Sequence, residues 1–355
     1  MSKTSFVPSA AKIKVIGLGG SGSNAITRMV REQIRGVEFY AMNTDAQALA
    51  VCEAPQRIQL GERITRGLGA GGNHIVGKRS AEESADEIKR VVSGADMVFI
   101  AAGMGGGTGT GSAPVVAELA KRNGALVIAV VTKPFTFEGA HRRKVAEEGI
   151  RDLVHQVDTL IIVPNDKILD LCDSRTNVDG AFKHADECLQ QGVQAIAEVI
   201  TVPGLINLDF ADVGAIMKNA GPAWMSIGHG GGKNRAADAA RQALASPLLD
   251  VSIEGATGVL FNISGADLTL FEVNEAAEII RKAVDPEANI IFGVVVDPNM
   301  HRDVRLTLIA TGFASKESML GLEREKEMDK LVRGLNKDEL DAPAYARHGG
   351  VLGRY

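Results

Sequence analysis

Two glycine-rich segments, each lying between a short apolar run and a helical pattern, constrain the fold of this chain more than any other feature. The second segment is Gly103-Met104-Gly105-Gly106-Gly107-Thr108-Gly109-Thr110-Gly111, with six glycines in nine residues. So many glycines cost conformational entropy on folding, and a loop that only packed would gain nothing in return. A loop that wraps two or three phosphates needs consecutive inward N–H groups and small hydroxyl side chains. The second segment therefore indicates phosphate binding.

The first segment, Gly17-Leu18-Gly19-Gly20-Ser21-Gly22-Ser23-Asn24, directly precedes a helical pattern. A helix start offers a phosphate unpaired N–H groups and the positive end of the helix dipole. The Gly17-x-Gly19-x-x-Gly22 spacing is also the fingerprint of a dinucleotide-binding dehydrogenase. Such an enzyme usually has an acid at the end of its second strand, where this chain has Asn43. A nicotinamide dehydrogenase therefore remains an alternative, which Asn43 disfavours.

Two serines interrupt the first segment. If Ser21 or Ser23 had to adopt a positive φ angle, its Cβ would weaken phosphate binding. Its hydroxyl could instead donate a hydrogen bond to a phosphate. The serines leave the strength of binding open, but not binding itself.

Apolar runs of β type alternate with longer stretches of helical period from residue 12 to about 163. The runs are Lys12–Ile16, Val37–Met42, Asp96–Ala102, Leu126–Val131 and Thr159–Val163. This alternation predicts a parallel sheet with helices on both faces. One of these helices is expected near Lys78–Val92, as an amphipathic helix that covers the sheet.

The longest helical pattern covers residues 178–200 and ends before Pro203-Gly204. We interpret it as a helix that joins two domains. Beyond it, strands are expected at Ala223–Ile227, Gly258–Ile263, Ile290–Val296 and Val304–Ala310, and helices at Asn234–Ala245 and Val273–Val284. Polar and apolar residues alternate in Val304–Leu308, so the second sheet should have one wetter face. The prediction is a Rossmann-like α/β domain with a parallel sheet, followed by a smaller α/β or α+β domain.

Length and composition limit the remaining possibilities. A chain of 355 residues suits two packed domains, and a net charge of −5 without a basic patch argues against nucleic acid as a partner. The three cysteines are too few and too scattered for a disulfide framework or a metal site, which suits a reducing cytoplasm. No apolar run approaches the ~20 residues of a membrane span, and the first residues lack the apolar stretch of a signal peptide. We expect a cytoplasmic protein without direct membrane insertion.

Further motifs follow in order along the chain. They are Asn43-Thr44-Asp45-Ala46-Gln47, Arg66-Gly67-Leu68-Gly69-Ala70-Gly71, Pro134-Phe135-x-Phe137-Glu138-Gly139, Pro164-Asn165-Asp166 and Asn207-Leu208-Asp209-Phe210-Ala211-Asp212. Together with Gly103–Gly111, they resemble the tubulin superfamily of GTPases in the form of the bacterial cell-division family FtsZ, from residue 12 to about 313. The resemblance implies the tubulin/FtsZ fold and the binding of GTP and GDP.

The resemblance also implies nucleotide-binding residues, position by position. Phosphates are expected at Gly20, Ser21, Gly22, Ser23, Asn24, Gly107, Thr108 and Gly109, with Ala70 and Gly71 closing over the γ-phosphate, and the nucleotide site also includes Gly19, Gly103, Met104, Gly105 and Gly106. Glu138 and Arg142 are expected on the ribose side, and Asn165, Phe182 and Asp186 around guanine. The site further includes Asn43, Asp45, Gly69 and Pro134.

The chemistry of two of these residues suits guanine. Asp186 can accept hydrogen bonds from N1–H and from the exocyclic amine of guanine, and Phe182 can stack on the base. Adenine lacks this pair of donors, so the sequence favours GTP over ATP. Without the resemblance, Asp186 would also fit a solvated helix carboxylate and Phe182 a core aromatic.

Asp209 and Asp212 are three residues apart at the start of a helix, where aspartate commonly acts as a cap. The resemblance gives them, with Asn207, a catalytic role, in which this loop of one subunit covers the nucleotide of the next and orients water against the γ-phosphate. Hydrolysis would then require head-to-tail assembly into a protofilament, which is an open heterologous contact. Mg²⁺ is expected mainly on phosphate oxygens and water, with no dedicated protein site. A tubulin-like scaffold without turnover is the non-enzymatic alternative, against which the two carboxylates argue.

The organisation of the whole chain follows from the same resemblance. The expected parts are an N-terminal extension (1–11), a GTP-binding domain (12–176), a connecting helix (177–203), a C-terminal GTPase-activating domain (204–314), a charged linker (315–338) and a partner-binding tail (339–355). In the tail, Asp341–Arg347 is similar to a peptide that docks on membrane-tethering division proteins, and a disordered end without a partner is the alternative. The expected protein is a GTP-hydrolysing cytoskeletal polymer that forms the division ring at mid-cell.

Overall fold

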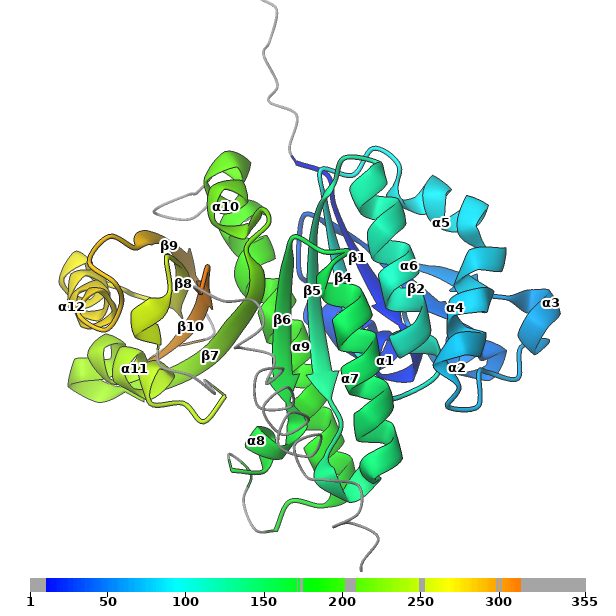
Figure 1. The fold of residues 1–355 in the computed structure, drawn as a ribbon. Coiled ribbons are helices and arrows are strands. Elements are labelled where there is room, and N and C mark those ends of the chain that lie inside the picture. The colour runs from blue at the N-terminus through cyan, green and yellow to red at the C-terminus, as the bar shows by residue number, and fades with distance from the viewer. Residues whose placement is uncertain are drawn as a thin grey trace, which may run out of the picture. The chain divides into compact units, whose positions relative to one another are not determined.

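Ten strands form one continuous sheet in the part of the chain that the structure describes, in the order β3-β2-β1-β4-β5-β6-β7-β10-β8-β9 (Figure 1). The structure is a computed structural model and describes residues 11–170, 172, 175–201, 209–248, 253–297, 300 and 302–313. Residues 1–314 belong to one compact unit and residues 315–355 to another. All the described residues belong to the first unit, so the predicted tail Asp341–Arg347 lies outside them.

The first six strands are parallel, as the alternation of apolar runs predicted. They are β1 (Ile13–Leu18), β2 (Val37–Asn43), β3 (Gln56–Gln59), β4 (Met97–Gly103), β5 (Leu126–Lys133) and β6 (Thr159–Pro164). The side chains of β1, β4 and β5 are buried almost throughout, which is typical of a parallel sheet covered on both faces. β3 has no apolar run of its own and was not predicted.

Two groups of helices cover the two faces of this part of the sheet. They are α1 (Gly19–Arg31), α2 (Ala46–Val51), α3 (Glu62–Thr65), α4 (His74–Glu83), α5 (Ala85–Val92), α6 (Thr108–Arg122), α7 (Ala140–Val154), α8 (Asn165–Leu169) and α9 (Val178–Thr201). Helix α1 packs against α9, and α4, α5 and α7 pack against α6, on the opposite side of the strands (Figure 1). Alternate strand residues, such as Val15 and Phe99, contact the α1 and α9 side.

The helix predicted over Lys78–Val92 is two helices. α4 ends and α5 begins at Ser84, whose φ and ψ angles are −92° and 15°. The Ser84 hydroxyl accepts a hydrogen bond of 3.0 Å from the amide of Gly61, at the start of α3. This side-chain hydrogen bond to a neighbouring loop competes with the backbone hydrogen bonds of a continuous helix, which explains the break between α4 and α5.

Helix α9 confirms the predicted long helix. Its apolar stripe, which includes Leu189, Val193 and Ile196, is fully buried in the same core as strands β1, β4 and β5. Near its C-terminus, the Thr201 hydroxyl donates to the carbonyl of Arg35 at 3.0 Å, which ties that end to the loop before β2. The helix is therefore a part of the first core along most of its length.

The C-terminal part continues the sheet. Its elements are α10 (Phe210–Met217), β7 (Gly221–Gly231), α11 (Arg235–Leu244), β8 (Gly258–Gly265), α12 (Leu270–Arg281), β9 (Asn289–Val296) and β10 (Asp303–Thr311). β7 pairs in parallel with β6 over three residues and antiparallel with β10 over eight, so the two predicted sheets are one. A second core lies between these strands and helices α11 and α12. The opposite face lies against α9 and is buried as well, with Leu260 and Ile309 in the first core and Asn262 and Thr307 only 3% and 5% exposed, so the prediction of a wetter face is wrong.

A buried arginine fastens the corner between β8 and α12. Arg235 donates to Asp267 and to Glu272, each at 2.7 Å, and its side chain is 8% exposed. The hydrogen bond from this guanidinium lowers the pKa of the Glu272 carboxyl to about 2.

No helix among the described residues is long and apolar enough to cross a bilayer.

Candidate nucleotide site

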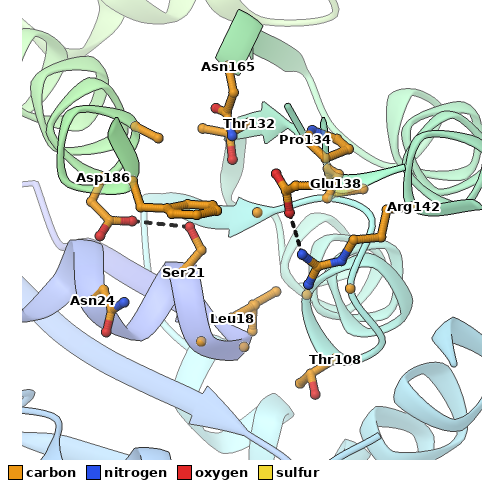
Figure 2. Close-up of a pocket in the computed structure, with 18 of the residues that line it drawn as sticks. Leu18, Ser21, Asn24, Thr108, Thr132, Pro134, Glu138, Arg142, Asn165 and Asp186 are labelled. Carbon is orange, nitrogen blue, oxygen red and sulfur yellow. Dashed lines mark hydrogen bonds and ion pairs between the residues drawn. The ribbon is translucent and has the colours of Figure 1, made fainter. Parts of the chain in front are cut away.

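A cavity of about 390 Å³ lies at the carboxyl edge of the parallel strands (Figure 2). Its walls come from the ends of β1, β4 and β5, from the starts of α1, α6 and α7, and from α8 and α9. The volume falls in the range of ordinary small-ligand pockets. Ligands of doubly wound sheets bind at this edge, where the strand order reverses between β1 and β4.

Two helix N-termini meet at one side of the cavity. α1 begins at Gly19, directly after β1, and α6 begins at Thr108, directly after the glycines that follow β4. Neither helix has an acidic residue in its first turn, so neither offsets its positive dipole end with a carboxylate of its own. This side therefore suits a chain of phosphates.

The glycines of the first segment serve two different purposes. A Cβ added to Gly20 would meet no atom within 4 Å, because that position faces the open cavity. A Cβ added to Gly22 would lie 2.4 Å from the carbonyl oxygen of Ala101 in β4. Gly20 therefore leaves room for a ligand, and Gly22 leaves room for the neighbouring strand.

The opposite side of the cavity has the chemistry to bind a base. Phe182 is 38% exposed and contacts the Phe135 ring edge-on, with the ring centroids 5.3 Å apart. Asn165 is buried, and its Oδ1 atom has no hydrogen-bond partner. Asp186 is 8% exposed. An aromatic face, an unpaired amide oxygen and a carboxylate fit a base that presents several N–H donors, as guanine does.

Burial governs the charge of Asp186. Loss of solvent raises the pKa of this carboxyl to about 6, while a hydrogen bond from Ser21 and the charge of Arg28 lower it. Arg28 lies on α1 and forms an ion pair of 3.2 Å with Glu187 on α9. The pKa of this carboxyl therefore lies closer to neutral pH than that of an ordinary aspartate, and a ligand that donates to it would stabilise the ionised form.

Glu138 and Arg142 form an ion pair between the two sides of the cavity (Figure 2). Glu138 also accepts a hydrogen bond of 2.8 Å from the amide of Phe135. The pair lies at the start of α7, where its polar atoms are available to a sugar hydroxyl. Thr132 and Pro134 lie beside it in the lining.

Sixteen of the predicted nucleotide-binding residues line this cavity. They are Gly19, Gly20, Ser21, Asn24, Gly103, Met104, Gly106, Gly107, Thr108, Gly109, Pro134, Glu138, Arg142, Asn165, Phe182 and Asp186. Leu18, Thr132 and Ala185 also line it and were not predicted. Their side chains carry no distinctive chemistry, and the available signal was their position beside predicted residues at the ends of strands and on α9.

Eight predicted residues do not line the cavity. They are Gly22, Ser23, Asn43, Asp45, Gly69, Ala70, Gly71 and Gly105. Asp45 caps α2 by accepting from the amides of Gln47 and Ala48, and its neighbours bond to the loop around Gly67 and Gly69. Ala70 lies close to Gly107, because a Cβ added there would come within 2.7 Å of the Ala70 Cβ. Asp45, Gly69 and Ala70 therefore belong to a second layer of loops beside the phosphate side.

Helices α4 and α6 meet backbone to backbone just behind this layer. A Cβ added to Gly77 would lie 2.1 Å from the carbonyl oxygen of Gly107, and one added to Gly111 would lie 2.0 Å from that of His74. Contacts this short exclude every side chain larger than hydrogen. The loop that contains Ala70 enters α4 directly at its cap, Asn73, and is therefore held close to the phosphate loop.

The predicted catalytic carboxylates lie far from this cavity in the fold. Asp209 caps α10 by accepting a hydrogen bond of 2.8 Å from the amide of Asp212, and both residues are exposed. The end of α10 packs against the amino end of β6, where Thr159 donates to the carbonyl of Met217. The cavity is lined by Asn165, directly after the carboxyl end of the same strand, and Figure 1 shows α10 near the other end of the strands. Asn207 lies outside the described residues.

Comparison with known proteins defines the class first. Residues 12–173 match the model of the Tubulin/FtsZ family GTPase domain, and residues 221–314 match that of the FtsZ family C-terminal domain. The protein is a tubulin-like GTPase that binds GTP and GDP, and the predicted fold and activity are confirmed.

Solved structures narrow the class to a family. The structure of an empty FtsZ dimer from M. jannaschii is 50% identical, with a TM-score of 0.83, over 85% of this chain and 88% of that chain. A mutant FtsZ from M. jannaschii is 49% identical, with a TM-score of 0.84, over 86% and 92%. The chain belongs to the FtsZ family. A GTPγS-bound protofilament of CetZ2 from Haloferax volcanii shares the fold at 20% identity and a TM-score of 0.74, over 90% and 99%.

Proposed function

We propose that this protein polymerises head to tail into protofilaments and hydrolyses GTP at a site completed by Asp209 and Asp212 of the adjacent subunit. The observation that carries the proposal is the placement of these exposed carboxylates at the end of the strands opposite the nucleotide cavity. Within the cavity lining, the carboxylates of Glu138 and Asp186 already have partners in Arg142 and Ser21. A water that attacks the γ-phosphate is therefore oriented from outside the subunit.

Exposed apolar side chains around the cavity support the same contact. We call them the apolar rim, which consists of Leu68, Phe137, Leu169 and Val178. All four belong to segments that follow the carboxyl ends of strands, and Leu68 and Val178 are 82% and 63% exposed. A second copy whose α10 face covered the cavity would bury this rim. Repetition of such a heterologous contact generates an open filament.

The nucleotide fits the residues that surround it. Gly20 and Gly106 leave space for phosphates beside the two helix N-termini, and Asn165 offers an unpaired oxygen to the base. Bound with the phosphates, Mg²⁺ would neutralise their charge, held mainly by phosphate oxygens and water because it gives up its waters reluctantly. The chain's own residues bind and orient GTP, and the neighbour's carboxylates hold the water.

We extend the proposal to the whole chain. Residues 12–176 form the GTP-binding domain, the connecting helix in 177–203 adds Phe182 and Asp186 to the base site, and 204–314 present the activating loop that includes Asn207. The filaments form the division ring at mid-cell in the cytoplasm, and the tail residues Asp341–Arg347 bind membrane-tethering division proteins after the linker 315–338. The family membership and the cytoskeletal relatives support this assignment.

A mixing experiment tests the shared site. Gly20→Leu places a side chain in the open cavity and blocks GTP, whereas Asp212→Ala keeps the cavity and removes a carboxylate. Neither variant should hydrolyse GTP alone. When the two are mixed before GTP is added, one junction type in four is competent, so at most about a quarter of wild-type activity returns.

Glu275→Ala, which removes an exposed carboxylate of α12, is the matched control and should retain activity alone. Sedimentation must show that the two inactive variants co-assemble. A mixture that co-assembles and stays inactive contradicts the proposed inter-subunit mechanism.

A further inference from the structure

Ser21 faces the base side of the cavity and not the phosphate side. Its hydroxyl donates a hydrogen bond of 3.2 Å to Oδ1 of Asp186, from the first turn of α1 to α9 (Figure 2). Ser21 and Ser23 both have negative φ angles within α1, so the backbone strain considered for them does not arise. The hydroxyl that could have served a phosphate is instead the partner of the base-side carboxylate.

The space for this contact depends on a glycine in the other loop. A Cβ added to Gly103, at the end of β4, would lie 2.8 Å from Cβ and 3.0 Å from Oγ of Ser21. The side chain of Ser21 therefore occupies the room that Gly103 leaves empty. The ion pair of Arg28 with Glu187 joins the same two helices about two turns farther along α1, which keeps Asp186 within reach.

Geometry limits what the carboxylate can do once it is bonded in this way. Each carboxylate oxygen has two lone-pair sites, and the Ser21 hydroxyl takes one of those on Oδ1. The bond restricts rotation of the group about Cβ–Cγ and leaves acceptor sites on both oxygens for a ligand. Guanine presents N1–H and the exocyclic amine side by side, which is the donor pair that a fixed carboxylate accepts.

We propose that Ser21 is a positioning residue for base selection, whose hydroxyl orients the Asp186 carboxylate for the two donors of guanine. This inference rests on the proposed role of Asp186 in the site. It makes the first glycine-rich segment bifunctional, since its backbone faces the phosphates and one of its side chains acts on the base. Ser21 would then affect the preference for guanine indirectly, because its hydroxyl bonds to Asp186 and not to the base.

The same hydrogen bond favours the charged form of Asp186. Burial raises the pKa of this carboxyl to about 6, and the bond from Ser21 opposes that rise. Two other charged groups lie close to this carboxyl, namely Arg28 on α1 and Glu187, which lies beside Asp186 on α9 and pairs with His184 at 2.8 Å. The ion pair of Glu138 and Arg142 faces it across the cavity. Removal of the hydroxyl should therefore raise the pH below which guanine binding weakens.

Direct titration with GDP and with inosine diphosphate tests the proposal. Inosine lacks the exocyclic amine, so the ratio of the two affinities measures how much the hydrogen bond between this amine and the carboxylate contributes to binding. Ser21→Ala should weaken GDP binding about five- to tenfold, reduce the preference for GDP over inosine diphosphate, and move the acid limb of GDP binding to higher pH. Thr27→Val on the same helix removes a hydroxyl that bonds to Ser23 and lies outside the cavity lining, and is the matched control.

Asp186→Ala and the double variant separate the possible failures. If Asp186→Ala leaves the GDP preference unchanged, the proposed role of Asp186 itself is wrong. If Asp186→Ala removes the preference but Ser21→Ala does not alter it, only the inference about Ser21 is overturned. An equal loss of GDP affinity from Ser21→Ala with and without Asp186 would assign the hydroxyl to the phosphates and overturn it as well. The expected result is no further loss when Asp186 is absent.

Discussion

Alanine at Gly20 and alanine at Gly22 should have opposite effects, although the two positions are two residues apart. A methyl group at Gly20 contacts nothing within 4 Å and lies in a helix with ordinary φ, so the fold should gain up to about 1 kcal/mol from the better helix former. The same methyl occupies the space that we assign to a phosphate. Losing one hydrogen bond to a charged group costs about 1.5–3 kcal/mol, so GDP should bind about 10- to 150-fold more weakly.

A methyl group at Gly22 lies 2.4 Å from the carbonyl oxygen of Ala101 and 2.8 Å from the carbonyl carbon of Gly17. Both are backbone atoms that cannot rotate aside, and overpacking of this kind costs about 1–3 kcal/mol. Gly22→Ala should therefore lower the thermal midpoint of the nucleotide-free protein, which Gly20→Ala should not.

Thermal unfolding with and without GDP, together with titration of fluorescent GDP, measures both effects. A bound ligand raises the midpoint by mass action, so Gly20→Ala should show an unchanged or raised midpoint without GDP and a reduced shift on adding it. If Gly20→Ala binds GDP as tightly as the wild type does, the assignment of this face of α1 to phosphate is wrong.

Two further predictions concern stability. Asp186 has a raised pKa, so its contribution to the free energy of unfolding is complete below its ordinary value of 3.8 and is lost as pH rises through about 6. The side chain of Asp186→Asn is neutral at every pH. In urea unfolding at pH 7.5, the free energy of unfolding of this variant should be about 2–3 kcal/mol larger than that of the nucleotide-free wild type. If the same difference remained at pH 3.5, this reasoning would be refuted. Arg235→Ala leaves two carboxylates without their partner and should cost about 3 kcal/mol in the same assay. Because the pKa of Glu272 is lowered to about 2, the stabilisation is present above 4.5 and declines as pH falls through about 2, so an Arg235→Ala deficit that does not shrink on acidification would contradict the assignment.

The parallel sheet could be predicted because its strands are buried on both faces. A run such as Leu126–Val131 is apolar throughout and too short for a helix, so few alternatives fit it. The break at Ser84 could not be predicted, because its cause is the amide of Gly61, 23 residues away. The continuity of the sheet was missed for a similar reason. Whether β7 pairs with β6 depends on three residues of contact between distant segments.

The cavity was predictable to the extent that its chemistry is local. Consecutive glycines before a helix indicate phosphate binding whatever surrounds them, and the family resemblance supplied Asn165, Phe182 and Asp186 on the base side. The contact between Ser21 and Asp186 joins residues 165 positions apart and depends on the space at Gly103, so no pattern along the chain reveals it. Leu18 and Thr132 line the cavity only because their strands end there.

The contact between α4 and α6 fixes the separation of the two helices, and single substitutions cannot change this separation gradually. Helices that meet through side chains can drift apart or together as those side chains change size. Here Gly77 and Gly111 face carbonyl oxygens directly, so the separation is set by backbone alone. Homologous sequences should therefore vary freely on the outer faces of these helices and keep glycine at both positions. Together the two glycines hold the loop that contains Ala70 at a constant distance from the loop that contains Gly107.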